Sequence, residues 1–186
     1  MTKLKISFMM IILSALAACG GTNTVQPSST AKLPIDSKIQ NMSISKIIKV
    51  KQGPMVSQSA LVECQLPSQF PQLLKQKAAD DNINVTLVDQ LNKDAKGYQL
   101  AAEFTQIMSA GNAFIGHRKY SQIHLTLYKD GKKLSESDLG RYSGGGMFAG
   151  FKGSCSVLRR TVEANAQDAV VWLNSPVDGA KMGDMN

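Results

Sequence analysis

Short stretches of alternating hydrophobic and polar residues dominate the chain between residues 43 and 142. Alternation with a period of two is expected of strands that bury one face. Five stretches fit a strand, the first mixing apolar residues with Ser and Lys and the last more polar: 43–51, 83–89, 98–104, 123–127 and 133–142. Between the last two, Asp130-Gly131 is a dipeptide typical of a tight hairpin turn. The pattern predicts about five strands.

Two further segments have helical spacing. Residues 66–79 repeat apolar positions every three or four residues, with Ser68 as a candidate N-cap and Pro71 in the first turn, where proline is tolerated. Residues 157–173 form a long amphipathic pattern. The order strand, helix, four strands, helix predicts an α+β fold. We expect a two-layer sandwich, with a mainly antiparallel sheet of about five strands and two helices on one face.

The first residues have the features of a secretory signal peptide. Lys3 and Lys5 precede an apolar run over 6–13, and small residues then lead to Cys19. A basic start, a short apolar region and a small-residue cleavage site define such a signal. The apolar run is well short of the ~20 residues that a membrane-spanning helix needs. We therefore expect residues 1–18 to be removed.

Leu16-Ala17-Ala18-Cys19 resembles the lipobox of bacterial lipoproteins. The resemblance implies that the Cys19 thiol receives a diacylglycerol, that the signal is cut before it, and that the new amine is acylated. Several acyl chains are enough for stable anchoring in a membrane. In that family an Asp after the cysteine favours retention in the inner membrane, so Gly20 favours the outer membrane. The expected location is the periplasmic side of the outer membrane.

Composition divides the rest of the chain into three parts. Residues 19–41 are rich in Gly, Ser, Thr and Pro, lack an apolar period, and predict a flexible tether behind the lipidated cysteine. Residues 42–174 hold the predicted strands and helices, so they form the expected periplasmic domain. Residues 175–186 contain one proline and two glycines and predict a flexible tail.

The predicted domain also resembles an uncharacterised family of small bacterial lipoproteins over residues 83–173. The resemblance rests on the stretch Gly97-Tyr98-Gln99-Leu100-Ala101-Ala102-Glu103-Phe104-Thr105, on the hairpin at Asp130-Gly131, and on Gly144-Gly145-Gly146 before the last helix. The expected shape is similar to the amino-terminal domain of the Tol-Pal translocation protein and to exopolysaccharide-export lipoproteins that form rings. The resemblance implies an envelope role and no known reaction.

The charge balance is moderately basic. The 186 residues are 43% hydrophobic and 19% charged, with 21 Lys and Arg against 14 Asp and Glu. Without the signal peptide the chain keeps a formal charge of +5, because Lys3 and Lys5 are lost with no acid. The basic residues form no block typical of a nucleic-acid-binding arm. A mildly basic surface is the simplest interpretation; an affinity for anionic polysaccharide, peptidoglycan or lipid head groups is the alternative.

Cys64 and Cys155 remain after Cys19 is assigned to the anchor. Disulfides persist in exported proteins, and each of these cysteines lies just before a predicted helix. If both helices run in parallel over one face of the sheet, their starts can meet. A bridge closes a loop of about 90 residues and stabilises by up to about 4.6 kcal/mol in the chain-entropy model. We expect this disulfide; two free thiols are the alternative.

A glycine-rich segment precedes the last helix. Gly145 and Gly150 have the spacing of a phosphate-binding loop, but Phe151 stands where that loop needs lysine, so nucleotide binding is not expected. The apolar residues Met147, Phe148 and Phe151 either fold back over the sheet edge or form a tip that binds a partner. We take these three residues as the leading candidate for a partner-binding site.

The remaining polar residues suggest no chemistry. His117, placed in a loop, and His124, on a strand, are expected to be surface histidines, since no metal-binding motif accompanies them. Glu136 and Asp138 are expected to be solvated charges on an edge strand. No catalytic residue, metal or cofactor is predicted.

Two functional hypotheses follow. The first is a non-enzymatic lipoprotein that binds or helps to assemble another envelope component, a protein partner or a second copy of itself. The second is an envelope hydrolase of cell wall or polysaccharide whose site is built from dispersed residues. A cleft in which carboxylates or histidine converge favours the second.

Overall fold

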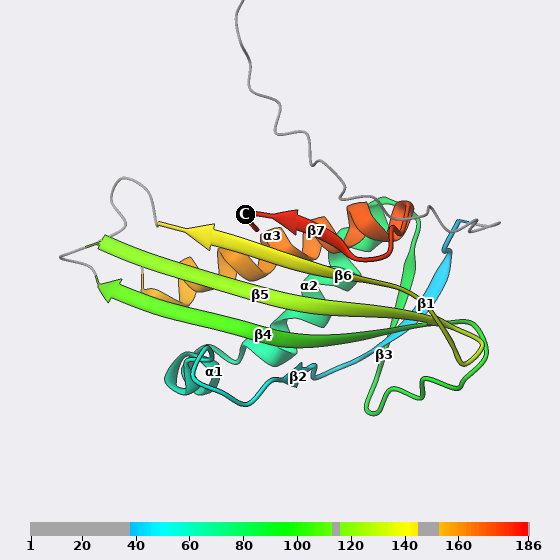
Figure 1. Ribbon diagram of the computed structural model, residues 1–186, viewed down its shortest axis with the longest axis horizontal. Helices are drawn as coiled ribbons and strands as arrows, with labels where there is room; N and C mark the ends of the chain where they lie inside the picture. Colours follow the sequence, from blue (N-terminus) through cyan, green and yellow to red (C-terminus); the bar gives the residue numbers. More distant parts are fainter. Residues whose placement is uncertain (1–37, 113–115, 145–152, 186) are drawn as a thin grey trace, which may run out of the picture.

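Three long antiparallel strands form the centre of the sheet in the computed structural model, which describes residues 38–112, 116–144 and 153–185 (Figure 1). They are β4 (Tyr98–Asn112), β5 (Gly116–Lys129) and β6 (Lys132–Ser143). The predicted hairpin turn joins β5 to β6. Asp130 and Gly131 have φ angles of 50° and 81°. This left-handed backbone suits the residues of a tight hairpin and explains the dipeptide.

Short parallel strands extend the sheet on both sides. On one side lie β1 (Asn41–Ser45) and β3 (Asn84–Val88), with β2 (Lys49–Val50) also beside β4; on the other lies β7 (Ala180–Gly183). The strand order is β3-β1-β4-β5-β6-β7. Strands that run in parallel need a crossover connection, and helices supply two of the crossovers. Helices α1 (Gln58–Cys64) and α2 (Leu66–Asp80) connect the β1–β2 segment to β3, and α3 (Ser154–Asn174) connects β6 to β7.

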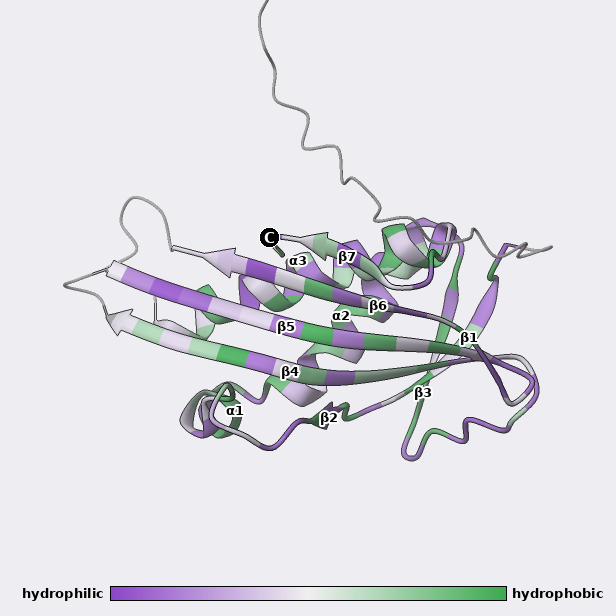
Figure 2. Cartoon of the chain, in the orientation of Figure 1, coloured by the Kyte–Doolittle hydropathy of each residue, from purple (hydrophilic) through white to green (hydrophobic). Residues whose placement is uncertain are grey.

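The long helices α2 and α3 lie side by side against one face of the sheet, behind it in the view of Figure 1. Apolar side chains from this face pack against apolar side chains of α2 and α3. Those fully buried include Leu100, Phe104, Ile123 and Leu125 from the strands and Phe70, Leu74, Leu158 and Val162 from the helices. Alternating hydropathy along β4 follows from this one-sided burial (Figure 2). Among the described residues, no helix has both the length and the apolar character needed to cross a bilayer.

The predicted fold class is confirmed, with additions. Within the described residues the sheet has seven strands and three helices accompany it, in place of about five and two. The two antiparallel ladders carry most of the paired residues, while all the short strands pair in parallel. The first predicted strand divides into β1 and β2. Helix α1 was not predicted; Ser57 caps its start, accepting from the backbone N–H of Ala60 at 3.5 Å.

The prediction of a flexible tail is wrong for residues 180–183, because they form β7 beside β6. Side chains hold this strand in place. The Ser137 hydroxyl donates to the Ala180 carbonyl at 2.9 Å, and the Asp184 carboxylate accepts from the Tyr142 backbone N–H at 2.8 Å. At the other end of the domain, Ile39 is fully buried, so the folded part begins before residue 42.

Candidate functional site

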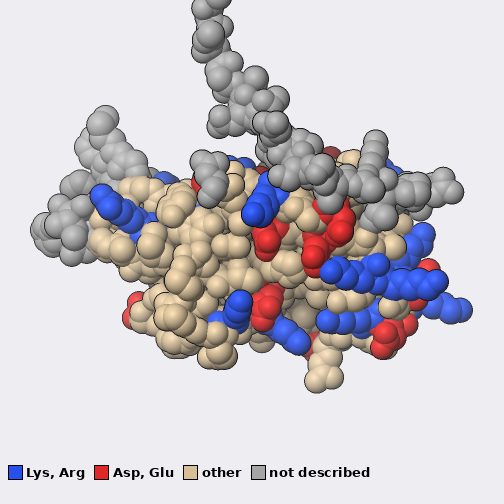
Figure 3. Space-filling model, viewed as in Figure 1, with Lys and Arg blue, Asp and Glu red and all other residues tan. Residues whose placement is uncertain are grey.

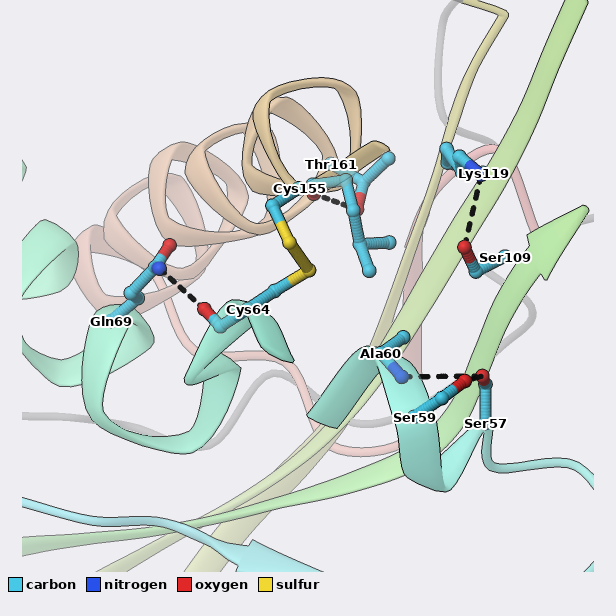
Figure 4. Close-up of a disulfide and its surroundings, with 10 residues drawn as sticks. Ser57, Ser59, Ala60, Cys64, Gln69, Ser109, Lys119, Cys155 and Thr161 are labelled. Atoms are coloured by element: carbon cyan, nitrogen blue, oxygen red, sulfur yellow. Dashed lines mark hydrogen bonds between the residues drawn. A yellow bond between two sulfur atoms is a disulfide. The ribbon is translucent and has the colours of Figure 1, made fainter. Parts of the chain in front are cut away.

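The predicted disulfide between Cys64 and Cys155 is present, joining the end of α1 to the start of α3 (Figure 4). The two Cα atoms are 5.2 Å apart, within the usual range for a disulfide. The side chain of Gln69 donates to the carbonyl of Cys64 at 2.6 Å. The bridge therefore fixes the helix layer and belongs to the scaffold.

The other site residues predicted from the sequence lie outside the described residues. These are the lipidated Cys19 and the partner-binding candidates Met147, Phe148 and Phe151. Both of their assignments stay predictions.

A cluster of polar side chains lies between the helix-facing side of the sheet and α3, near Ile107, which pairs with Ser121. Ser121 hydrogen-bonds to Thr161 of α3 at 2.6 Å, and the Asn165 amide donates to the Ser121 carbonyl at 3.0 Å. Nearby, the Arg141 guanidinium donates to both carboxylate oxygens of Asp168, each at 2.6 Å. These interactions satisfy the hydroxyls of Ser121 and Thr161 and the amide nitrogen of Asn165, as buried polar groups require. The cluster therefore fixes α3 on the sheet.

Lys119 of β5 also lies on the helix-facing side of the sheet. Its side chain is fully buried, which is unusual for a lysine. Its ammonium donates to the Ser109 hydroxyl at 2.9 Å (Figure 4) and to the Ala110 carbonyl at 3.2 Å. Burial lowers the pKa of Lys119, since removal from water disfavours the charged form. His117, on the same strand, is also buried; the prediction of a surface loop histidine is wrong because β5 begins at Gly116.

Among the residues that the structure describes, no helix covers the opposite face of the sheet, which is turned toward the viewer in Figures 1 and 3. A row of charged and titratable residues crosses this open face over five strands. In register, the row runs Lys49 on β2, Glu103 on β4, His124 on β5, Asp138 on β6 and Lys181 on β7. Basic and acidic side chains alternate along the row. This alternation is a favourable arrangement for neighbours across a sheet.

His124 is the centre of this row. Its Nδ1 lies 2.9 Å from a carboxylate oxygen of Asp138, and its Nε2 lies 3.3 Å from the Thr126 hydroxyl and 3.7 Å from the carboxylate of Glu136. About a third of its side chain is exposed, as expected for a surface histidine. Glu136 and Asp138 are not on an edge strand, because β7 lies beyond β6.

Two hollows lie on the open face, one on each side of the charged row. The first has a volume of about 490 Å³ and opens between β4 and the segments that follow β1 and β3. Charged, polar and apolar side chains line it, among them Lys49, Asp89, Lys93, Glu103, Thr126 and the exposed Ile47. Charged side chains gather over this half of the face, toward the β5–β6 turn (Figure 3).

The second hollow has a volume of about 530 Å³ and lies toward the far ends of the long strands, over a mainly uncharged surface (Figure 3). Its lining is Gln106, Tyr120, Gln122, Tyr142, Lys181, Asp184 and Met185. Burial, with Tyr142 and Asp184 nearby, raises the pKa of Tyr120. Its hydroxyl therefore stays protonated at neutral pH and donates to the Gln122 side-chain oxygen at 3.4 Å.

Three side chains of this face have the order of a catalytic triad without its other parts. Thr126, His124 and Asp138 have the order of a nucleophile, a base and an orienting acid. Acyl transfer also needs N–H donors aimed at a developing oxyanion. β5 is a central strand, paired with both β4 and β6, so the sheet uses its backbone N–H groups. No group of three acidic, histidine or cysteine side chains in the described residues has an arrangement suited to a metal ion.

Sequence patterns did not single out the residues of the second hollow. A β-bulge between Phe104 and Gln106 interrupts the alternation of β4, because Thr105 has no partner in the register. The bulge places Gln106 opposite Gln122 on the open face, although simple alternation puts Gln106 on the buried face. In the sequence, only the loss of strict alternation after Phe104 points to this change of face.

No protein-family model matches this sequence, and neither does any curated protein. Three solved structures have a related arrangement: a Xanthomonas campestris protein of the DUF330 family, the minor lipoprotein of Acinetobacter baumannii, and dodecameric PelC of Paraburkholderia phytofirmans. Their identities are 11%, 10% and 11%, with TM-scores of 0.48, 0.47 and 0.45. The alignments cover 73%, 75% and 77% of this chain, and 84%, 96% and 96% of the other chains. Likenesses of this size carry no argument about function.

Proposed function

We propose that this protein is a lipid-anchored lipoprotein of the cell envelope whose domain binds another envelope component without catalysing a reaction. The uncovered face of the sheet carries the proposal. Antiparallel sheets can leave one face in water, but the two hollows and the row of charges make this face a structured surface. The occupant is a protein partner, a second copy of the chain, or an envelope polymer.

Location and anchoring are supported by two separate features. The lipobox at Leu16-Ala17-Ala18-Cys19 makes Cys19 the attachment point for lipid on the periplasmic side of the outer membrane. The Cys64–Cys155 disulfide supports export, because disulfides persist outside the reducing cytoplasm. The segment between Cys19 and the buried Ile39 then serves as the tether between membrane and domain.

The glycine-rich loop is a second proposed contact surface. Met147, Phe148 and Phe151 are apolar, and burial of one such side chain contributes roughly 1.5–3 kcal/mol. Two or three of them are enough to dominate a small interface. Replacing Phe148 and Phe151 with Ser should abolish crosslinks to the partner and leave the thermal midpoint nearly unchanged. Earlier unfolding with the partner retained would show that these residues belong to the core.

Membrane fractionation combined with chemical crosslinking in intact cells tests the proposal. The wild-type chain should be found in the outer-membrane fraction and form a crosslinked species of higher mass. Cys19→Ala should release the protein from the membrane fraction or leave an unprocessed precursor. Normal processing and membrane retention of this variant contradict the anchor, and absence of any crosslinked species contradicts the binding role.

A further inference from the structure

The second hollow combines an exposed aromatic ring with two side-chain amides. Tyr142 is 58% exposed, although large aromatic side chains are usually buried. Its ring packs against Tyr120, with centroids 4.3 Å apart and planes tilted by 36°. Since Tyr120 is buried, this packing holds Tyr142 in place on the surface. The result is an aromatic platform whose position is fixed before any ligand arrives.

The two amides lie beside this platform in the adjacent row of the sheet. Gln106 and Gln122 face one another in register on β4 and β5. The Tyr120 hydroxyl donates to the oxygen of Gln122, which orients that amide. No hydrogen bond within the described part of the chain uses the amide nitrogen of Gln122 or the side chain of Gln106. Donors and acceptors thus remain in one small area.

Glycine at position 140 lets Tyr120 and Met185 pack directly on the sheet. In register with Gln122 stands Gly140 on β6, and next to it Gly183 on β7. A Cβ atom at Gly140 would lie 2.4 Å from the Tyr120 hydroxyl and 2.5 Å from Met185. Any larger residue at position 140 therefore displaces two residues that line the hollow. Strand β7 and the residues after it supply the rim, with Lys181 and Asp184.

This lining matches the chemistry of a sugar. The C–H groups on one face of a pyranose ring are slightly positive and pack on the negative face of an aromatic ring. Adjacent hydroxyls act as both donors and acceptors, which suits a pair of amides. The volume of about 530 Å³ is within the range of about 300–1,000 Å³ for small-ligand sites. With one cation and one anion at the rim, the hollow favours neither a polyanion nor a polycation.

We infer that this hollow binds an uncharged sugar unit of an envelope glycan, with Tyr142 as the stacking platform and Gln106 and Gln122 as hydrogen-bonding partners for its hydroxyls. The inference rests on the proposed envelope location, where glycans are the abundant polymers. It narrows the occupant of the open face to a carbohydrate. The first hollow, with its many charges, is not part of this site.

Methyl NMR of the full chain, purified in detergent and labelled on its methionine methyl groups, tests the inference. Met185 lines the hollow, whereas Met55 is exposed before α1 and serves as an internal reference. The probes are neutral tetramers of β-1,4-linked N-acetylglucosamine and of β-1,4-linked glucose, with a galacturonate tetramer as the charged comparison. At least one neutral tetramer should move the Met185 signal and leave that of Met55 in place.

Variants then assign the contact. Tyr142→Ala should weaken binding at least about fivefold, because an aromatic contact is lost, and Tyr142→Phe should stay within about twofold. Lys49→Ala, in the other hollow, is the matched control and should bind as the wild type does. The inference is wrong if no neutral tetramer moves Met185 at about 10 mM, a generous limit for weak binding, or if Tyr142→Ala binds unchanged. If, in that case, a protein still crosslinks to the open face, the proposed binding function is supported and only the inference of a sugar ligand is wrong.

Discussion

The two faces of the sheet follow opposite rules. The helix-facing side buries large apolar residues and pairs the side chains of Ser121 and Arg141 with α3, and the disulfide joins α1 to α3 above it. No described segment covers the open side, and its polar side chains form a row of charges between two hollows. The same strands supply both faces. We therefore expect stability to depend on the helix-facing side, and we propose that binding depends on the open side.

Neighbouring residues of β4 provide the sharpest test of this contrast. Phe104 is fully buried under the helices, and Glu103 points to the open face. Phe104→Ala should lower the free energy of unfolding by about 3–5 kcal/mol, through lost burial and the cavity left behind. Glu103→Ala should change it by less than about 1 kcal/mol, since this side chain is only partly buried and charge interactions on a solvated face contribute little. Urea denaturation measures both, and similar effects at the two positions would contradict the division between faces.

The disulfide should have the next largest effect. Cys64→Ser with Cys155→Ser should cost about 2–5 kcal/mol, because the unfolded chain regains the freedom of a long loop. Denaturation of the double variant measures the cost. As a control, the native mature domain should have a mass about 2 Da below its reduced form, the two protons lost when the bond forms. Two alkylatable thiols in freshly isolated protein would disprove the bridge.

The smallest predicted effect concerns an ion pair between the helices. Lys77 of α2 lies 2.9 Å from Glu163 of α3, and its hydrogen bond lowers the pKa of Glu163. A lowered carboxyl pKa stabilises the fold above the ordinary value of 4.5, and this contribution is lost as pH falls through the lowered pKa. Because the pair is partly exposed, Glu163→Gln should lower the free energy of unfolding by only about 0.5 kcal/mol at neutral pH, and by nothing in acid. Denaturation at both pH values measures the difference. An equal cost at both pH values would contradict this assignment.

Hydrophobic periodicity predicted the strands and long helices because one-sided burial imposes it directly. The strand order could not be predicted, since β1, β3 and β7 reach their parallel partners by crossovers that periodicity does not describe. β7 was missed because Pro176 and Gly179 indicate a turn. The interactions that hold it, such as that of Asp184 with the Tyr142 N–H, join residues about 40 positions apart.

The candidate site was harder still to predict. The disulfide could be predicted because two cysteines remain after Cys19 and because disulfides persist in exported proteins. The row from Lys49 to Lys181 depends on the register of five strands, and the bulge after Phe104 shifts that register for the residues that follow. Gln106, Gln122 and Tyr142 belong to no motif; only the folded sheet brings them together.

Site-specific photo-crosslinking in intact cells tests most directly whether binding belongs to the open face. Gln106 lies on that face, and Gln167 is an exposed glutamine of α3 on the helix side. A benzophenone amino acid at position 106 should capture a protein or glycan partner in the envelope, and the same probe at position 167 should capture none. Capture at 167 with none at 106 would contradict the account, because the partner would then bind the helix layer.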